Sequence, residues 1–320
     1  MQLKEFKHQP VLAKESPDAL VTQPDGVYID GTFGRGGHSR LILEKLSSKG
    51  RLIAFDRDPQ AVEAAREIAD ERFSIIHAPF AQMKEELAKI GVERVDGVFL
   101  DIGVSSPQID DPERGFSFRF DGPLDMRMDT SSGQTAAEWI AKVDVGEMTR
   151  VFKEYGEEKF ATKAARAIAA ARDAKPIETT KQLADIIAQA LPRNKKDLGQ
   201  HPATRIFQAI RIQVNQELTQ LCEALEAAGS LLNPEGVLAV ISFHSLEDRI
   251  VKRFFEAAHN PASKLDPRLP LLPEQMPAPL FERPKRVLPS KEECEENPRA
   301  RSSVLRFAVR TEAPWPEGGV

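Results

Sequence analysis

The fold of this chain is decided by the stretch Tyr28-Ile29-Asp30-Gly31-Thr32-Phe33-Gly34-Arg35-Gly36-Gly37-His38. A short apolar run that ends at Ile29 predicts a buried strand, and the four glycines that follow lead into a helical pattern at 39–46. Strand, glycine loop and helix in this order open a nucleotide-binding α/β sheet. An ordinary strand-to-helix turn with additional glycines has the same pattern, so the loop alone does not decide the function.

The charge of this loop favours a cationic ligand. Asp30 ends the first predicted strand, and the glycine spacing differs from the G-x-G-x-x-G of dinucleotide sites. A pyrophosphate needs backbone N–H groups at a helix N-terminus, whereas a carboxylate suits a positive group. S-adenosylmethionine carries a ribose, an ammonium and a sulfonium but no phosphate. The loop therefore favours this cofactor over NAD.

Two more predicted strands also end in an acid. The strand at 51–56 ends in Asp56, roughly 20 residues after the loop, where an acidic residue meets ribose hydroxyls. The strand at 95–101 ends in Asp101. Ligands of α/β sheets bind at the carboxyl edge of the parallel strands. Together with Asp30, these acids predict a ligand site at that edge, because an apolar core does not require them.

An aromatic residue and a polar segment are expected at the same edge. The third predicted strand, 73–77, is followed by Phe80, which either borders the adenine or is an ordinary core aromatic. Beyond Asp101 the chain continues as Ser105-Ser106-Pro107-Gln108. Oxygen atoms in such a motif accept hydrogen bonds from an exocyclic amine and favour the pyramidal form that attacks a methyl group. Taken alone, the motif is better explained as a Ser-Pro turn.

The stretch 110–129 interleaves aromatic residues with arginines. These are Phe116, Phe118 and Phe120 with Arg114, Arg119 and Arg127. A loop longer than about 15 residues is usually functional or disordered, and aromatics beside arginines suit stacking on unpaired bases. The alternative is a hydrophobic anchor that ties an insertion to the core.

Helical periodicity then continues without a strand pattern. The predicted helices are 134–142, 145–155, 158–172 and 179–190. They predict an all-helical domain inserted between the fourth and fifth strands. Basic residues gather towards its end, which a solvated helix face would also explain; they are Arg166, Arg172, Lys175, Arg193, Lys195 and Lys196. One long helix from Ile206 to about Leu232 is expected to return the chain to the sheet.

The fifth strand is predicted at 236–243 and is followed by His244. This histidine would lie at the carboxyl edge, either within reach of the substrate or as a structural turn residue. Ser245 and Asp248 have the spacing of a capping box for the next helix. The last strand, 304–309, is expected to close the sheet as an antiparallel edge strand.

The remaining segments have weaker patterns. Residues 260–289 are rich in proline and predict an extended excursion. Cations in the last third of the chain are candidates for phosphate contacts; they are Lys285, Arg299 and Arg301. The tail after Thr311 is expected to be loose. Residues 8–15 form either an arm over the cofactor or, as we favour, a plain extension.

Composition restricts the class of protein. The chain has 320 residues, of which 41% are hydrophobic and 29% charged, as in a soluble globular protein. It contains neither an apolar run of membrane-spanning length nor a signal-peptide core. Cys222 and Cys294 form no metal-ligand or disulfide pattern, so a reducing cytoplasm is expected. A net charge of -5 does not indicate nucleic-acid binding, which depends on a local basic face.

Several long motifs resemble one known family. They are His8-x-Pro10-Val11-Leu12, Asp30 to Ser39, Phe55-Asp56-Arg57-Asp58-Pro59, Leu100-Asp101-x-Gly103 to Gln108, Arg114-Gly115-Phe116-Ser117-Phe118, Gly122 to Met128, Ile241 to Arg249 and Asn297-Pro298-Arg299-Ala300-Arg301. The sequence resembles the bacterial MraW (RsmH) family of 16S rRNA cytosine-N4 methyltransferases. The motifs span nearly the whole chain, and no motif position departs from the pattern.

This resemblance implies a class I S-adenosylmethionine-dependent methyltransferase fold, an α/β Rossmann-like doubly wound sheet with an inserted all-helical domain. We place the core at 1–110 and 206–320 and the substrate-recognition insertion at 111–205. The implied reaction transfers a methyl group to N4 of a decoding-centre cytidine in 16S rRNA, with the RNA held in an assembling small subunit in the cytoplasm. A homo-oligomer is left open.

The resemblance also assigns residues to roles. The implied cofactor-binding set is Gly36, Gly37, His38, Asp56, Phe80, Asp101 and Gln108. Candidates for contacting the target amine are Asp101, Ser105, Ser106 and His244. The chemistry requires neither a metal nor a covalent cysteine. An NAD-dependent oxidoreductase and a non-catalytic RNA-binding assembly factor are the alternatives.

Overall fold

The computed structural model describes residues 10–192, 201–264 and 276–320. The chain forms two compact units, one made of Met1–Gly103 with Leu218–Val320 and the other of Val104–Glu217. Three expectations from the sequence fall wholly or partly outside the described residues: the start of the 8–15 segment, the basic residues after 192 and the middle of the proline-rich segment.

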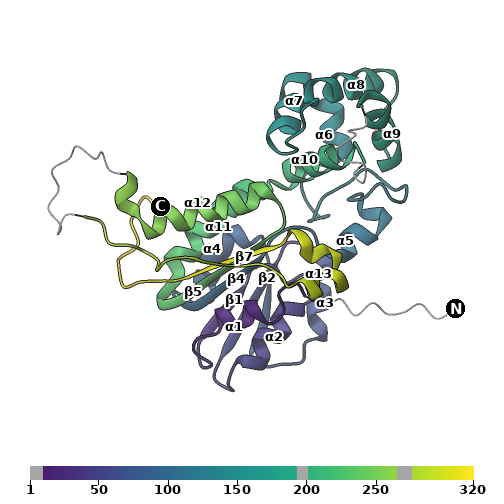
Figure 1. Ribbon diagram of the computed structural model, residues 1–320. Coiled ribbons are helices and arrows are strands. Elements are labelled where there is room, and N and C mark those ends of the chain that lie inside the picture. Colours follow the sequence, from purple (N-terminus) through teal and green to yellow (C-terminus); the bar gives the residue numbers. More distant parts are fainter. Residues whose placement is uncertain (1–9, 193–200, 265–275) are drawn as a thin grey trace. The chain divides into compact units, whose positions relative to one another are not determined.

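The first unit is built on a seven-stranded sheet in the order β3-β2-β1-β4-β5-β7-β6 (Figure 1). Its strands are β1 (Val27–Asp30), β2 (Arg51–Asp56), β3 (Phe73–His77), β4 (Val95–Asp101), β5 (Leu232–Ser242), β6 (Lys285–Val287) and β7 (Val304–Val309). The first five strands are parallel, and β7 pairs antiparallel with both β5 and β6. This is the expected class I methyltransferase sheet, in which the direction of the strand order switches between β1 and β4.

Helices cover both faces of this sheet (Figure 1). They are α1 (Glu15–Leu20), α2 (Gly37–Lys45), α3 (Pro59–Ala64), α4 (Met83–Lys89), α11 (Glu217–Leu231), α12 (Ser245–His259) and α13 (Lys291–Glu296). Successive strand residues enter opposite cores: Tyr28 and Phe99 pack with α1 and α2, whereas Ile29 and Val98 pack with α4, α11 and α12. Because both faces are buried, the strands read as continuous apolar runs.

The end of the sheet differs from the sequence expectation. The strand at 304–309 is antiparallel as expected, but it lies inside the sheet, because Lys285–Val287 pairs with its outer side. Part of the predicted proline-rich excursion is therefore the edge strand β6. Three residues with two exposed cations gave no apolar alternation from which a strand could be predicted.

The tail is not loose, contrary to expectation. Trp315 packs against Phe254 and Phe281, with ring centroids 6.4 and 6.3 Å away. The guanidinium of Arg310 lies 5.4 Å from the Trp315 ring centroid, and Val320 donates its N–H to the carboxylate of Glu226 at 3.0 Å. The aromatic contacts anchor the tail through a partly buried Trp315 against the core of the first unit.

The second unit is helical, as expected. Its helices are α5 (Ser106–Asp110), α6 (Ala136–Lys142), α7 (Val145–Glu154), α8 (Ala161–Ala174), α9 (Thr180–Ala190) and α10 (Thr204–Asn215). They surround one core of apolar residues that includes Trp139, Phe152 and Phe207. None of the helices in the described part of the chain is long and apolar enough to cross a membrane.

The single long helix predicted from Ile206 is instead two helices. Gln216 has a left-handed backbone with φ 52°, which ends α10 and separates it from α11. Ile210 packs in the core of the second unit and Leu221 in the core of the first. The compact second unit therefore includes α10 and runs from Val104 to Glu217, whereas the sequence placed the insertion at 111–205.

Candidate active site

Asp30 holds the glycine loop in place from inside the first unit. Its side chain has no exposed surface. One carboxylate oxygen accepts a hydrogen bond from the Ser39 hydroxyl at 2.6 Å, and the other accepts from the Thr32 N–H at 3.1 Å. Burial raises the pKa of Asp30, which the bond from Ser39 partly offsets. Asp30 therefore joins the end of β1 to the start of α2. Because it is buried and both of its oxygens accept hydrogen bonds within the loop, it has a structural role and does not contact a ligand directly.

Two glycines of the loop are required by its geometry. Gly36 has φ 75°, and a Cβ there would lie 2.8 Å from the ring of Phe33. A Cβ at Gly37 would lie 2.7 Å from Cγ of Pro10. Pro10 of the N-terminal segment thus covers the start of α2. Two residues later in the same segment, Leu12 donates its N–H to Oε1 of Glu293 at 2.6 Å. These contacts favour the interpretation of this segment as an arm that packs on the glycine loop. They do not favour the plain extension that we preferred from the sequence.

Asp56 accepts two backbone N–H groups at the end of β2. Gly34 donates to Oδ2 at 2.7 Å and Asp58 donates to Oδ1 at 2.8 Å. Burial raises the pKa of Asp56 to about 6, although both N–H bonds act in the opposite direction. An ionised carboxylate accepts up to about four hydrogen bonds, so acceptor capacity remains for ribose hydroxyls.

His38 and Asp101 form a coupled pair. Nε2 of His38 lies 2.9 Å from the carbonyl oxygen of Val11, which only accepts, so this nitrogen carries a proton. Nδ1 lies 3.4 Å from Oδ2 of Asp101. Burial alone would lower the pKa of His38, but the hydrogen bond and charge of Asp101 outweigh it and raise the pKa. The raised pKa favours the protonated ring more than in a free histidine, and the 3.4 Å contact orients the carboxylate.

The second oxygen of Asp101 is available to a ligand. The Asp101 N–H donates to Oγ1 of Thr32 at 2.6 Å. Oδ1 is buried and has no hydrogen-bond partner among the residues that the structure describes. A buried carboxylate oxygen without a donor is unfavourable, so this atom marks a position where a ligand N–H or O–H group fits.

Phe80 lies beside the loop, as the sequence predicted for the carboxyl edge. It begins the short 3-10 helix Phe80–Gln82 after β3 and is partly buried against the core. A Cβ at Gly31 would lie 3.1 Å from Cβ of Phe80. The first unit thus gathers the predicted residues Gly36, Gly37, His38, Asp56, Phe80 and Asp101 at or next to the strand ends.

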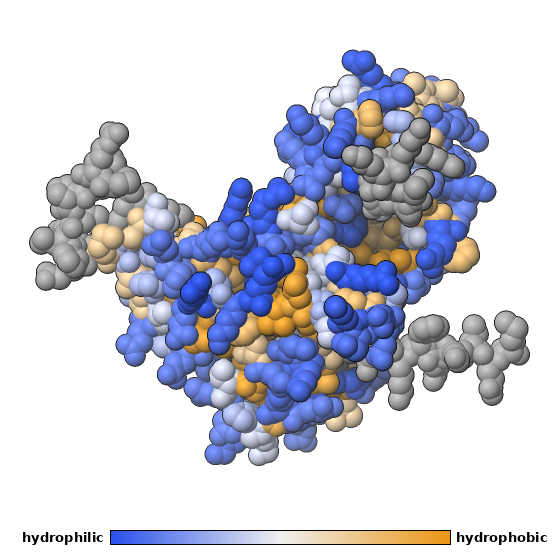
Figure 2. Space-filling model, in the orientation of Figure 1, coloured by the Kyte–Doolittle hydropathy of each residue, from blue (hydrophilic) through white to orange (hydrophobic). Residues whose placement is uncertain are grey.

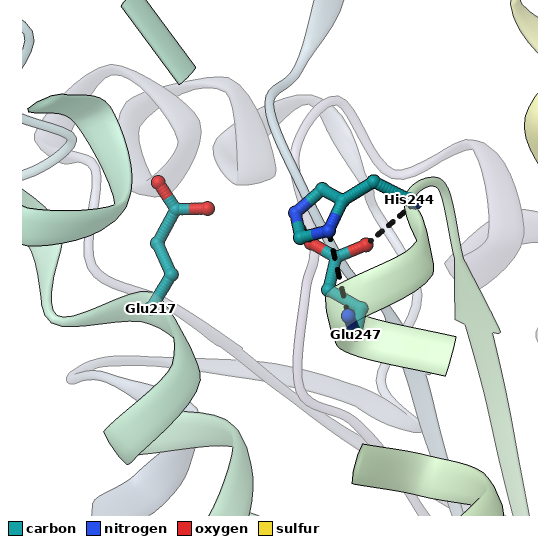
Figure 3. Close-up of side chains that lie close together, drawn as sticks. All are labelled: Glu217, His244 and Glu247. Atoms are coloured by element: carbon teal, nitrogen blue, oxygen red, sulfur yellow. Dashed lines mark hydrogen bonds and ion pairs between the residues drawn. The ribbon is translucent and has the colours of Figure 1, made fainter. Parts of the chain in front are cut away.

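His244, also at a strand end, caps helix α12 (Figure 3). Its Nδ1 accepts the N–H of Glu247 at 3.4 Å, and the buried Glu247 carboxylate accepts the N–H groups of Phe243 and His244 at 2.9 and 3.3 Å. The capping box is formed by His244 and Glu247, so the predicted pair of Ser245 and Asp248 is wrong by one position. Because Nδ1 accepts, the proton is on Nε2, which lies 3.0 Å from Oε1 of Glu247.

The polar motif belongs to the second unit. Ser105 is the N-cap of α5, and its N–H donates to Oε1 of Gln108 at 2.9 Å. Gln108 is buried, and Ser106 is the first residue of the helix. The motif is therefore a structural cap, as its Ser-Pro sequence indicated. The roles assigned to Ser105, Ser106 and Gln108 stay predictions.

The aromatic loop is mostly an anchor. Arg114 lies over the Phe116 ring at 5.9 Å, and Phe118 packs on Phe207 at 4.7 Å between centroids. Phe120 alone of the three is exposed, at 62%. Phe118 thus packs against the core of the second unit, and the base-stacking interpretation stays a prediction for the exposed Phe120.

Sequence reasoning missed Asn215, which fastens this loop. Its Nδ2 donates to the carbonyl oxygen of Met126 at 2.7 Å, and its Oδ1 accepts the N–H of Met128 at 2.8 Å. Met126 has φ 63°. An asparagine at the end of an amphipathic helix carries no sequence signal for such a long-range contact.

Comparisons with known proteins agree with this arrangement. Residues 5–311 match the MraW methylase family. Proteins named "Ribosomal RNA small subunit methyltransferase H" from Burkholderia cenocepacia and Burkholderia vietnamiensis are each 56% identical over 96% of this chain and 98% of their own length. A solved putative rRNA-methylase from Clostridium thermocellum shares 10% identity with TM-score 0.41, covering 92% of this chain and 90% of its own. This last match is too weak to carry an argument.

The oxidoreductase alternative is inconsistent with these matches, since both the family and the relatives are methylases. The glycine loop, the acids that end β2 and β4, and the near-complete coverage of the relatives all lead to one assignment. This chain belongs to the MraW methylase family.

Proposed function

We propose that this protein transfers a methyl group from S-adenosylmethionine to the N4 amine of a decoding-centre cytidine in 16S rRNA. Membership of a methylase family and relatives named for the small-subunit rRNA support the reaction class and the substrate. The observation that carries the proposal is the buried Oδ1 of Asp101, which has no donor within the described chain and lies next to the glycine loop.

The residues at the strand ends fit this cofactor. The backbone at Gly36 and Gly37 admits the methionine part, Asp56 holds the ribose and Phe80 borders the adenine side. When bound, S-adenosylmethionine supplies a sulfonium-activated methyl group. His38 orients Asp101 through the 3.4 Å contact between Nδ1 and Oδ2, which leaves Oδ1 to accept from a positive or N–H-bearing group. Gln108 keeps the cofactor-binding role that the resemblance implies.

The target amine needs hydrogen-bond acceptors. Its lone pair is delocalised into the cytosine ring, and acceptors on its N–H groups favour the pyramidal form that attacks a methyl group. Asp101, Ser105 and Ser106 offer oxygen acceptors for this purpose. His244 stays a candidate for contacting the amine, although its Nδ1 is used by the helix cap and its Nε2 lies 3.0 Å from Oε1 of Glu247. The N4 proton leaves to a nearby oxygen or to water.

The cytidine has to leave its stack before it can react. The exposed ring of Phe120 is a platform on which an unstacked base can lie. A substrate within the assembling small subunit places the reaction in the cytoplasm.

The test is methyl transfer from labelled S-adenosylmethionine to small-subunit particles that lack the modification, with the product nucleoside identified by mass spectrometry. We expect N4-methylcytidine with the natural protein and a large loss with Asp101→Asn, which keeps the shape but removes the charge. Tight cofactor binding without any transfer would favour the non-catalytic assembly factor instead.

A further inference from the structure

Cations gather where helix α12 meets the edge of the sheet. Arg286 in β6 lies directly opposite Arg306 in β7, so both side chains are on the same face. Arg306 reaches α12, where Nε and Nη2 donate to Asp248 at 2.7 and 3.0 Å. Lys252 follows Asp248 by about one turn of α12, Arg253 comes next and lies about 140° around the helix from Asp248, and both cations are exposed. We call Lys252, Arg253, Arg286 and Arg306 the α12 basic face.

The positive charge of this face is only partly neutralised. Arg306 holds the pKa of Asp248 below its usual range, and the charges of Arg286 and Lys252 add to this effect. Asp248 is thus an ionised acid surrounded by cations. Glu256 lies 3.5 Å from Lys252, but both side chains are more than half exposed, and such a pair is weak. Hydrophilic side chains also gather over α12 in Figure 2.

The fold does not require this arrangement. Like charges directly opposite each other in a sheet are destabilising, and the pairing of Arg306 with Asp248 offsets this for one arginine only. Charges on an edge strand prevent pairing with another sheet, which would explain Arg286. That explanation does not extend to Lys252 and Arg253, which lie on a helix. Lys285, which the sequence suggested for phosphate binding, lies over Phe307 on the other face of the sheet.

The α12 basic face starts at the carboxyl edge of the sheet. Helix α12 begins directly after His244 at the end of β5. With about 1.5 Å per residue, Arg253 lies roughly 13 Å from His244 along the helix axis. A stacked nucleic-acid strand with about 3.4 Å per nucleotide covers this distance in about four nucleotides.

We propose that the α12 basic face binds the phosphate backbone of the RNA within a few nucleotides of the methylated cytidine. This inference rests on the proposed function and assigns a substrate contact to the first unit. RNA is favoured over an acidic protein because the face starts at the carboxyl edge of the sheet, where the proposed function places the target base, and an RNA strand carries one phosphate charge per nucleotide. A local face must then supply the attraction that the molecule as a whole lacks.

The experiment compares two double variants of the full chain that remove the same charge. Lys252→Gln with Arg286→Gln changes the face, and Lys49→Gln with Arg51→Gln changes exposed cations at the amino end of β2. Binding to naked small-subunit rRNA is measured over a range of KCl concentrations. We expect the slope of log K against log salt to become shallower by roughly 1 to 2 in the face variant. The control keeps the slope of the natural protein.

The outcomes separate this inference from the proposed function. Equal slopes in the two variants, with methylation of small subunits intact, overturn the face and leave the function. RNA binding that depends on the face, without methyl transfer, overturns the function and leaves the face. A face variant that loses poly-glutamate binding as much as RNA binding would show general anion attraction and overturn RNA as the specific occupant. Unchanged affinity for S-adenosylhomocysteine and unchanged thermal unfolding confirm that both variants are folded.

Discussion

At the scale of single residues, the site depends on how carboxylates are buried. Asp30, Asp56 and Asp101 were all recognised from the sequence, because each ends a strand of a parallel sheet. Their different tasks were not recognisable, since these depend on long-range partners. Asp30 is fully buried and holds the loop, whereas Asp101 retains an oxygen without a donor among the described residues. The sequence thus predicts where the acids lie, and the structure distinguishes what each one does.

Asp56 is expected to make cofactor binding pH-dependent. Its pKa is raised from 3.8 to about 6 by burial, so the carboxylate that accepts ribose hydroxyls is lost as the pH falls through 6. Affinity for S-adenosylhomocysteine, measured by calorimetry, should decrease from pH 7 to pH 5. Asp56→Asn should bind more weakly and lack this dependence, with RNA binding largely retained. A natural protein with constant affinity over this range would remove Asp56 from the ribose role.

The same residue affects the stability of the protein without cofactor. A carboxyl group whose folded pKa lies above its unfolded value favours the folded state more at low pH, so the contribution of Asp56 to the free energy of unfolding rises as the pH falls from about 6 towards 4. At neutral pH the buried charge is unfavourable. Comparing Asp56→Asn with the natural protein by urea unfolding at pH 7 and pH 4.5 isolates this contribution.

At the scale of elements, helices and strands with strong periodicity were predicted well, and their ends were not. The insertion helices and the parallel strands agree with the apolar patterns. The break at Gln216 was missed because apolar spacing continues through it, although the residues on its two sides enter different cores. The short strand β6 was missed because three residues carry too little pattern.

The cap of α12 is a feature of this scale. Glu247 is fully buried and accepts the N–H groups of Phe243 and His244. Glu247→Ala removes this acceptor and should lower the free energy of unfolding by about 1–3 kcal/mol. Ser245→Ala, at the exposed position that the sequence favoured, should change it by less than about 0.5 kcal/mol. Urea unfolding of the two variants decides between the two caps, and a larger effect at Ser245 would refute the His244 cap.

The aromatic loop allows a matched pair of substitutions. Phe118 packs on Phe207, so Phe118→Ala should destabilise the protein by about 3 kcal/mol. Phe120 is 62% exposed, and Phe120→Ala should leave stability unchanged while weakening RNA binding by about 1–3 kcal/mol. Thermal unfolding and rRNA binding are measured on both variants. Unaltered RNA binding by Phe120→Ala would show that the ring is not a stacking platform.

At the scale of the whole molecule, the fold class and the helical insertion were predictable, whereas the role of the tail was not. A tail with prolines and glycines resembles a loose segment, and only the structure shows Trp315 packed on Phe254 and Phe281. Contacts between distant parts of the chain leave no periodic pattern. For the same reason the sequence did not predict that the α12 face combines residues from a helix and two strands.

Removing the tail should therefore affect the first unit as a whole. Trp315→Ala is expected to lower the free energy of unfolding by about 2–3 kcal/mol, less than the loss of a fully buried aromatic residue, because the ring is only partly buried. Glu317→Ala, an exposed substitution in the same segment, is the control and should have little effect. Differential scanning calorimetry of the full chain provides the measurement. Equal unfolding temperatures would show that the tail does not stabilise the core.

The interrupted first unit also determines the order in which the protein can form during its synthesis. The strand β4 pairs with β5. Between the last residue of β4, Asp101, and the first residue of β5, Leu232, the chain has 130 residues. Translation at about 5–20 residues per second delivers the complete helical insertion before β5 leaves the ribosome. The second unit can thus fold while the sheet still lacks β5, β7 and β6, which leaves one edge of β4 unpaired. A nascent chain stalled just after Glu217 is a partly folded protein with an unprotected sheet, which makes it a natural client for chaperones.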